Sequence, residues 1–331
     1  MTPAVVTVIV LNYNGRRWLP GCLDALAGQR EPPAFEVILV DNGSSDGSEH
    51  FVRERGAGVV VLQTGANLGF AAGNNAGAAQ ARGEWLAFLN NDTVPDPHWL
   101  SALFGAAASY PGYDLITSRI VMLDDPSVLD SAGDGYLRAG GAFKRGHGQR
   151  AAAFGTPGEV FGACGAAFMI RRSLFERLGG FDESFFMVYE DVDLSYRARL
   201  TGARVWFAAD AIVGHAGSAT LGRASAVAVF HGQRNLEWTW VKNTPPGLLL
   251  QTALPHLMYS LVGILHYARR GHLWTAIRGK LSALAALRRV TAARRHIQRA
   301  RTVPAADVAR WMERRWLALK RREKSAVSVQ E

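Results

Sequence analysis

Three apolar runs near the N-terminus constrain the fold of this 331-residue chain more than any other feature. They cover residues 5–11, 35–40 and 85–89, and each ends in polar residues. Continuous β-branched, apolar runs of this length are typical of strands buried on both faces, as in parallel sheets. The segments between them are long enough for the crossover helices that parallel strands require: residues 18–29, 45–55 and 71–81. The first half therefore predicts a doubly wound, mostly parallel α/β sheet flanked by helices.

Polar side chains that follow the three runs form the first group of candidate site residues. They are Asn12, Tyr13, Asp41, Asn90, Asn91 and Asp92. Parallel strands bring their carboxyl ends to one edge of the sheet, where open α/β sheets bind ligands. Asp41 also begins a favourable turn and helix-capping sequence, so capping is an alternative role for it. Asp92 offers hard oxygen ligands suited to Mg²⁺ or Mn²⁺ carrying a diphosphate.

His215 is a candidate for a further metal ligand. It follows a short strand-like run, residues 204–208, and small residues around it would let a ligand approach closely. A lone histidine is more often a buried structural residue, and that alternative stays open for His215 taken by itself.

An acidic cluster at the start of a predicted helix forms the second group. Glu190, Asp191 and Asp193 lie in its first turn, directly after an aromatic run. Unpaired backbone N–H groups at a helix start favour negative charge, which is a structural explanation for one acid but not for three. Neighbouring like charges and apolar shelter raise carboxyl pKa values, and such a carboxylate can take a proton from a sugar hydroxyl. The cluster therefore predicts a general base.

The order of these motifs resembles that of family 2 glycosyltransferases, and most of all their bacterial rhamnosyltransferase-like branch. The resemblance covers about residues 5–220 and rests on residues 12–15, 40–46, 67–75, 89–92, 180–193 and His215. It implies a GT-A fold, a nucleotide-sugar donor, a divalent cation (Mg²⁺ or Mn²⁺) and inversion at the anomeric carbon.

The resemblance also implies roles for single residues. Asp191 matches the family's base, and Glu190 would orient it or share its proton. Asp41 would contact the nucleotide base or ribose, in a pocket lined by Asn12 and Tyr13 and supported by Asn67.

On the diphosphate side, Asp92 matches the last acid of the family's Asp-x-Asp metal motif, with Asn90 and Asn91 beside it in the nucleotide-sugar site. Asn90 departs from the pattern, because many relatives carry an acid there. His215 matches a histidine that joins the metal in some members.

The donor and acceptor are expectations that rest on the resemblance. Rhamnose on thymidine diphosphate is the favoured donor, and uridine diphosphate sugars are the alternative. The expected acceptor is a saccharide hydroxyl, on a polyprenyl-diphosphate-linked chain used in cell-envelope polysaccharide synthesis. A catalytically silent sugar-nucleotide or membrane-binding protein is a further alternative. A dinucleotide-dependent oxidoreductase is disfavoured, because residues 12–17 lack the Gly-x-Gly-x-x-Gly phosphate cradle.

The C-terminal region differs in composition from the rest. We expect a catalytic domain over residues 1–225 and a helical, membrane-associating region over residues 226–331. Residues 247–268 are apolar, and residues 269–331 hold 17 Lys and Arg but only 4 acids. Pro255 and His256 interrupt the apolar stretch, which favours a helix lying in the interface of an anionic membrane over a true span. A soluble helical subdomain is the alternative, and no nucleic-acid partner is expected because no binding module is recognisable.

Three further expectations concern location and local structure. Two cysteines, Cys22 and Cys164, and no signal peptide at the start predict a cytoplasmic protein, peripheral on the inner face of the cell membrane. Residues 161–170 have the pattern of a buried strand. The glycine-rich, cationic residues 131–158 predict a mobile surface loop, with an acceptor-side lid as the functional alternative.

Overall fold

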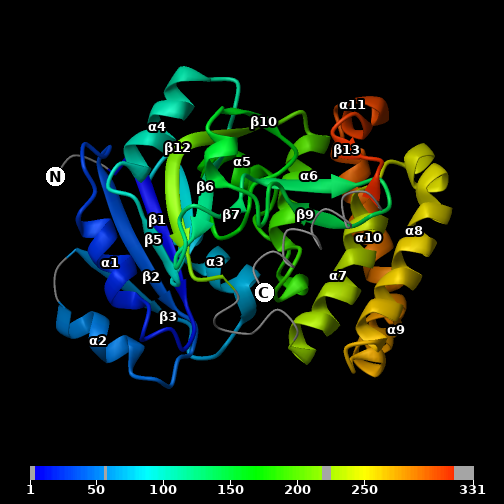
Figure 1. Ribbon diagram of the computed structural model, residues 1–331, viewed down its shortest axis with the longest axis horizontal. Coiled ribbons are helices and arrows are strands. Elements are labelled where there is room, and N and C mark those ends of the chain that lie inside the picture. Colours follow the sequence, from blue (N-terminus) through cyan, green and yellow to red (C-terminus); the bar gives the residue numbers. More distant parts are fainter. Residues whose placement is uncertain (1–3, 56–57, 218–224, 317–331) are drawn as a thin grey trace.

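A computed structural model describes residues 4–55, 58–217 and 225–316 (Figure 1). Its centre is a large twisted sheet with the strand order β10-β12-β6-β11-β4-β1-β2-β3. These strands are β1 (Val6–Asn12), β2 (Phe35–Asp41), β3 (Val59–Gln63), β4 (Trp85–Asn90), β6 (Leu115–Met122), β10 (Gly158–Val160), β11 (Ala167–Arg171) and β12 (Val205–His215). The α/β class and the mostly parallel sheet predicted from the sequence are confirmed.

The three apolar runs form β1, β2 and β4, which lie side by side in parallel. The predicted crossovers contain α1 (Leu19–Ala27), α2 (Ser48–Arg55) and α3 (Gly69–Ala79). In the register of the sheet Asn12 is opposite Asp41. Asn12 and Asp41 are therefore the last residues of two neighbouring strands and lie at the same edge of the sheet.

The second half of the sheet is mixed, and its edge strand β10 is antiparallel to β12. β11 lies antiparallel between β4 and β6, and β12 then continues parallel to β6. Two short strands, β5 (Thr93–Pro95) and β7 (Leu129–Ser131), pair with β12 and β6. The connecting helices in this half are α4 (Trp99–Ser109), α5 (Arg172–Arg177) and α6 (Glu190–Leu200).

Each face of the sheet packs against its own helices because successive strand residues point to opposite sides. On one face Val8 and Val10 pack in a cluster with Leu23 of α1 and Leu103 of α4. On the other face Ile9 and Phe88 belong to a cluster that includes Ala71 of α3 and residues of α5 and α6. The sheet is thus covered on both sides, which leaves its strand ends available to hold a site.

Residues 131–158 do not form the irregular surface loop predicted from their glycine content. They contain β8 (Asp134–Leu137), β9 (Ala142–Lys144) and the short helix η1 (Ala151–Phe154). β8 lies between β9 and β13 (Met312–Glu313) in a separate small sheet. Backbone N–H and C=O groups of this segment pair in the small sheet. The prediction of a mobile surface loop is therefore wrong for it.

The strand predicted over residues 161–170 is only partly correct. Regular pairing begins at Ala167. Before it, Gly162 pairs with Asp134 in an isolated bridge, and the N–H of Gly165 bonds to a side chain of α6. The first half of the apolar run is therefore a buried turn that serves the site.

The C-terminal region is helical, as predicted. It comprises α7 (Ala226–Asn243), α8 (Pro246–Ala268), α9 (Leu273–Ala285), α10 (Leu287–Ala300) and the short α11 (Ala305–Ala309). These helices gather on the side of the molecule away from α1 and α2, with α7 next to α6 and α8 at the outer edge (Figure 1). α8 continues through Pro255 without a break. The predicted boundary at residue 225 remains a prediction, and residues 317–331 lie outside the described residues.

Candidate active site

The first group of predicted site residues lies where β1 and β2 end. Asn12 Nδ2 donates hydrogen bonds to Asp41 Oδ1 (3.1 Å) and Ser44 Oγ (3.1 Å), and Asn12 and Asp41 are both buried. Asn91 Nδ2 donates to Asn12 Oδ1 (2.7 Å), which ties the end of β4 to the same group. Tyr13, 36% exposed, follows directly on Asn12. The structure therefore brings Asn12 and Asp41, predicted for the nucleoside, together with Asn91, predicted for the diphosphate side.

Gly15 lies against Asn12 and Asn91, where there is no space for a side chain. A Cβ at this position would lie 1.8 Å from Asn91 Nδ2 and 2.5 Å from Asn12 Oδ1. Any side chain there would break the bond between Asn12 and Asn91.

Asn67 is linked to the end of β2 through Asn42, a residue that the sequence prediction did not single out. Asn67 Oδ1 accepts hydrogen bonds from Asn42 Nδ2 (3.1 Å) and from the backbone of Gly69 (3.0 Å). Asn42 Oδ1 in turn accepts from the backbone of Leu68 (3.0 Å). Asn42 follows Asp41 directly, so it fixes the start of α3 against the end of β2. Its place after a candidate ligand was the signal that could have identified it.

Asp92 and His215 meet at the end of β4 and β12. His215 Nε2 lies 3.4 Å from Asp92 Oδ1, and both residues are buried. On its other side, His215 Nδ1 lies 2.8 Å from Asp130 Oδ2. Burial alone would lower the pKa of His215, but hydrogen bonds to Asp130 and Asp92 raise it. Asp130 therefore fixes the imidazole so that Nε2 points to Asp92.

Asp130 is a central residue of the site that sequence reasoning missed. It is fully buried on β7, and Lys144 Nζ lies 2.7 Å from its Oδ2 while His147 Nδ1 lies 3.2 Å from its Oδ1. Burial opposes ionisation, yet bonds from His147 and His215 and the charge of Lys144 hold the pKa of Asp130 far below its usual range. No local pattern marks this residue, because its partners come from other strands.

The Asp92–His215 pair has the geometry of two ligands on one cation. Ligands about 2.1 Å from an octahedral metal, at right angles, lie about 3 Å apart, which is close to the observed 3.4 Å. A carboxylate oxygen and an imidazole nitrogen held by a second carboxylate suit a divalent metal. The residues present thus fit Mg²⁺ or Mn²⁺. Asn90 lies at the last position of β4, and its N–H bonds to the carbonyl of Ala166 (3.0 Å).

Asp191 lies at the start of α6, where the turn before β11 reaches it. Its Oδ2 accepts a hydrogen bond from the backbone of Gly165 (2.7 Å), and its Oδ1 accepts one from the backbone of Val192 (2.8 Å). Burial raises the pKa of Asp191, and these backbone bonds oppose the shift. Because Ala166 is bonded to Asn90, Asp191 is held next to the strand end that carries Asp92.

Glu190 is buried beside Asp191, and its Oε2 has no hydrogen-bond partner among the described residues. Burial and the charge of Asp191 raise the pKa of Glu190 well above its usual range. Glu190 thus favours its neutral form, while Asp191 has two N–H donors that stabilise a carboxylate. Of the two acids, Asp191 is the one equipped to act as a base.

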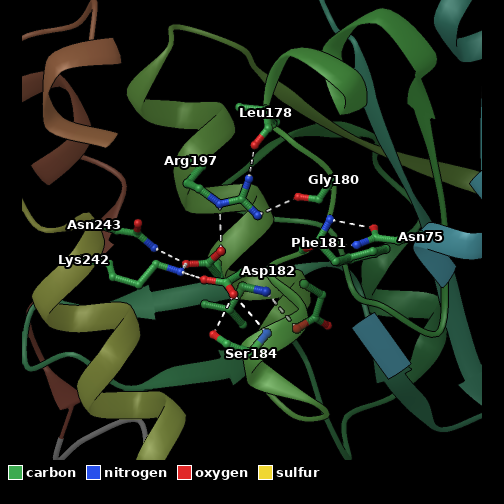
Figure 2. A network of polar contacts seen from close by, with 12 residues as sticks. Asn75, Leu178, Gly180, Phe181, Asp182, Ser184, Arg197, Lys242 and Asn243 are labelled. Carbon is green, nitrogen blue, oxygen red and sulfur yellow. Dashed lines mark hydrogen bonds and ion pairs between the residues drawn. The ribbon is translucent and has the colours of Figure 1, made fainter. Parts of the chain in front are cut away.

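Asp193 has a structural role instead. Figure 2 shows part of the polar network here, with Lys242 and Asn243 of α7 on one side and Arg197 of α6 on the other. Arg197 Nε lies 2.7 Å from Asp193 Oδ2, while Lys242 Nζ (3.0 Å) and Asn243 Nδ2 (2.8 Å) approach Oδ1. Lys242 also pairs with Asp182. The third acid of the cluster therefore anchors α6 to α7.

Asp134 and Cys164 complete the surroundings of Asp191. Ligand atoms of these three residues all lie within 4.8 Å of one another. Asp134 Oδ1 is buried without a hydrogen-bond partner among the described residues, and burial followed by the charge of Asp191 raises the pKa of Asp134 well above normal. Burial likewise raises the pKa of the Cys164 thiol. Asp134 was not predicted from the sequence.

With this geometry in place, comparison with known proteins identifies the class. The family model described as "Glycosyl transferase family 2" matches residues 7–179. The chain belongs to glycosyl transferase family 2 and is a transferase.

Two curated relatives show the same family. An N-acetylglucosaminyl-diphospho-decaprenol L-rhamnosyltransferase of Mycobacterium tuberculosis is 31% identical over 258 residues, which cover 69% of this chain and 81% of the relative. The O-antigen biosynthesis protein RfbC of Myxococcus xanthus is 33% identical over 235 residues, covering 67% of this chain and 18% of that protein.

Solved structures with a similar fold are GT-A glycosyltransferases. TarS residues 1–349 from S. aureus gives a TM-score of 0.54 at 18% identity, covering 92% of this chain and 88% of that one. The mannosyltransferase PcManGT from Pyrobaculum calidifontis, solved with GDP-Man and Mn²⁺, gives 0.54 at 19% identity, with 93% and 87% covered. The predicted GT-A fold is confirmed.

Proposed function

We propose that this protein is an inverting glycosyltransferase that moves rhamnose from dTDP-rhamnose to a hydroxyl of a polyprenyl-diphosphate-linked saccharide in cell-envelope polysaccharide synthesis. The observation that carries the proposal is the position of Asp191, a carboxylate held by two backbone N–H groups next to the strand end that bears Asp92. The choice of rhamnose and of a polyprenyl-diphosphate-linked acceptor is supported by the mycobacterial relative, an N-acetylglucosaminyl-diphospho-decaprenol L-rhamnosyltransferase.

The proposed reaction is a single displacement. Asp191 takes the proton of the acceptor hydroxyl as its oxygen attacks the anomeric carbon, and the bond from that carbon to the diphosphate breaks on the opposite face. The N–H groups of Gly165 and Val192 keep the Asp191 carboxylate aimed during the step. No covalent sugar intermediate is required, and the buried thiols of Cys22 and Cys164 take no part.

The donor would lie along the carboxyl ends of β1, β2 and β4. Asp41, Asn12 and Tyr13 would contact the nucleoside, and Asn67 would support that pocket through Asn42. Asn90 and Asn91 would line the diphosphate end.

Asp92 and His215 would hold Mg²⁺ or Mn²⁺ at that end. When bound, the cation would stabilise the charge that develops on the departing diphosphate. Asp130 keeps His215 in the orientation that this role needs.

A lipid-linked acceptor agrees with the outer surface of α8. Within the described residues, α8 is the one helix whose length and composition would allow it to cross a bilayer, and most of it is exposed. Its solvent-facing side carries large apolar residues that are more than half exposed: Leu250, Leu254, Leu257, Met258, Leu261 and Leu265. Trp274, Leu281 and Leu284 extend this surface onto α9. A soluble protein rarely leaves so many large apolar side chains in water without a partner.

Basic residues follow the apolar helix α8 in the sequence and occur on the next two helices. Arg269 and Arg270 follow α8, Arg278 lies on α9, and Arg288 and Arg295 lie exposed on α10. Exposed apolar side chains on α8, together with exposed arginines on the helices that follow, favour a helix that lies in the interface of an anionic membrane. We therefore place the protein in the cytoplasm, peripheral on the inner face of the cell membrane, where lipid-linked acceptors are presented.

The test is nucleoside diphosphate release by purified protein in detergent, with dTDP, UDP and GDP sugars, membrane lipid extract, and Mg²⁺, Mn²⁺ or chelator. Release from dTDP-rhamnose that needs lipid extract and metal is the expected result. Asp191→Asn should abolish release while donor binding persists. Release only from a UDP sugar would replace the donor, and donor binding without any release would favour a catalytically silent sugar-nucleotide-binding protein.

A further inference from the structure

The turn that leads into α6 has an unusual backbone. Phe186, Val188 and Tyr189 all adopt positive φ angles, of 63°, 65° and 79°. Residues with a Cβ rarely take this conformation, and a β-branched residue such as Val188 is a clear outlier. Conformations of this kind persist only where surrounding structure holds them, and they gather at functional sites. Here the strained turn ends one residue before Glu190 and two before Asp191.

One side chain from α7 holds this turn. The two N–H groups of Asn235 Nδ2 are shared among the carbonyl oxygens of Phe185 (3.0 Å), Met187 (2.8 Å) and Val188 (2.7 Å). Asn235 is fully buried, and its Oδ1 accepts a hydrogen bond from Arg234 Nε (2.9 Å). The three carbonyls require the nitrogen of the amide and the guanidinium requires its oxygen, so the orientation of Asn235 is fixed by its partners.

Arg234 supports the same turn from the next position. Its Nη2 donates to the carbonyls of Ser184 (3.0 Å) and Phe185 (2.9 Å). Adjacent residues of α7 thus satisfy the carbonyls of Ser184, Phe185, Met187 and Val188.

The carbonyl of the remaining residue, Phe186, points to the donor side. It accepts hydrogen bonds from the backbone of Phe70 (2.6 Å) and Ala71 (3.4 Å) at the start of α3. A Cβ at Gly69 would lie 2.5 Å from this oxygen, so the close approach requires glycine there. The turn is therefore held by α7 on one side and by the start of α3 on the other. The start of α3 is in turn bonded to Asn42.

We propose that Asn235 is a positioning residue for the base: by clamping the strained turn it sets where α6 begins and hence where the Asp191 carboxylate lies. The proposal rests on the proposed role of Asp191 in glycosyl transfer. Asn235 touches neither Asp191 nor the substrates' expected positions. It acts through the turn, and it lies in the C-terminal region, outside the segment that the family model matches.

The experiment compares the wild type with Asn235→Ala, Asn235→Asp and a control, Thr239→Val. Asn235→Asp keeps the side-chain shape but turns a carboxylate toward three carbonyl oxygens. Thr239 is fully buried on the same helix, and its Oγ1 has no partner in the described part of the chain, so an isosteric valine removes no bond. We expect both Asn235 variants to lose about 10- to 100-fold in kcat with donor KM within about 2-fold of the wild type, and Thr239→Val to match the wild type.

Two further readouts separate positioning from a merely structural role. Hydrogen exchange at residues 184–190 should become faster in both Asn235 variants, while exchange in β1 and β4 stays as in the wild type. The acid limb of kcat/KM against pH should also move, because Asp191 would change its distances to the Gly165 N–H. The charged and titratable groups facing Asp191 are Glu190 on α6, Asp134 on β8, Lys144 on β9 and Cys164 before β11.

Wild-type kcat and unchanged exchange in the Asn235 variants would overturn the proposal. So would a loss of activity that only follows the unfolded fraction, with the folded remainder fully active. If the wild type itself turns over no donor, the proposed function fails. The clamp is then still judged by exchange at residues 184–190, where faster exchange supports it and unchanged exchange refutes it.

Discussion

His215 lies between two carboxylates, with Nδ1 2.8 Å from Asp130 Oδ2 and Nε2 directed to Asp92. His215 and Asp130 are 85 positions apart in the sequence, and their contact connects β12 to β7. A histidine that donates one ring N–H to a carboxylate presents the other nitrogen as a ligand of fixed direction. The metal role of His215 stays a prediction, and the structure adds Asp130 as the residue that would hold the imidazole in place.

Asp130→Asn should therefore weaken activation by the cation. The amide cannot hold His215 and Lys144 as the carboxylate does, so we expect about 10- to 100-fold more Mn²⁺ for half-maximal activity. A Mn²⁺ titration of donor turnover measures this. Asp210→Asn, which removes an exposed acid on β12, is the control and should leave the titration unchanged. Equal Mn²⁺ requirements for wild type and Asp130→Asn would show that Asp130 does not support a metal ligand.

Gly165→Ala tests the contact that aims Asp191. A Cβ at Gly165 would lie 2.8 Å from Asp191 Oδ2, so the carboxylate must move away from its N–H donor. We expect kcat to fall about 10- to 100-fold with the donor's KM little changed. Gly155→Ala is the matched control, because the nearest atom to its added Cβ is 3.8 Å away. Steady-state kinetics of both variants decide the point, and an active Gly165→Ala enzyme would argue against Asp191 as the base.

The sequence predicted the ends of β1, β2 and β4 well, because short runs of apolar, β-branched residues bounded by polar ones are typical of buried strands. Asp41 and His215 are the last residues of β2 and β12, and Asp92 follows β4. Their proposed roles come from the order of the motifs. Asp130, Asp134 and Asn235 were missed because each acquires its partners from distant segments. Asn235, for example, bonds to carbonyls 47 to 50 positions earlier in the chain.

The wrong loop prediction and the partly correct strand prediction have the same origin. Glycines at 133 and 140 suggested a loop, but there they provide positive φ angles next to β8. The apolar pattern before Ala167 suggested a strand, but Gly162 and Gly165 use their N–H groups for Asp134 and Asp191 instead. The apolar composition of residues 161–166 correctly indicated that they are buried. It could not indicate which hydrogen-bond acceptor each backbone N–H would have.

Asp193 gives a prediction about stability and pH. Burial would raise its pKa, but Lys242 and Arg197 outweigh burial and lower the pKa from 3.8 to about 2. A lowered folded-state pKa stabilises the fold above the unfolded value, and this contribution is lost as pH falls from about 4 through 2. The shift corresponds to about 2 kcal/mol.

Urea unfolding of wild type and Asp193→Asn from pH 7 to pH 3 measures this contribution. At pH 7 the variant should be about 3 to 5 kcal/mol less stable, because it leaves buried cations without their partner. The difference should be constant down to about pH 5 and shrink below pH 4. Asp210→Asn should show no difference at any pH. A gap that stays constant down to pH 3 would mean that Asp193 is not held ionised by its neighbours.

The apolar outer face of α8 gives the last prediction. Leu254 and Leu261 are 67% and 52% exposed, and burying a leucine side chain is worth about 1.5 to 3 kcal/mol. Replacing both with Glu should lower binding to vesicles of anionic lipid at least about 30-fold, since apolar burial is lost and like charges are added. Vesicle co-sedimentation measures the effect, with Val60→Glu, at an equally exposed position on β3, as the control. Wild-type binding should weaken as salt rises, because salt screens the attraction between the exposed arginines of the C-terminal helices and the anionic lipid. If the wild type does not bind anionic vesicles even at low salt, the exposed leucines face another partner and the membrane assignment fails.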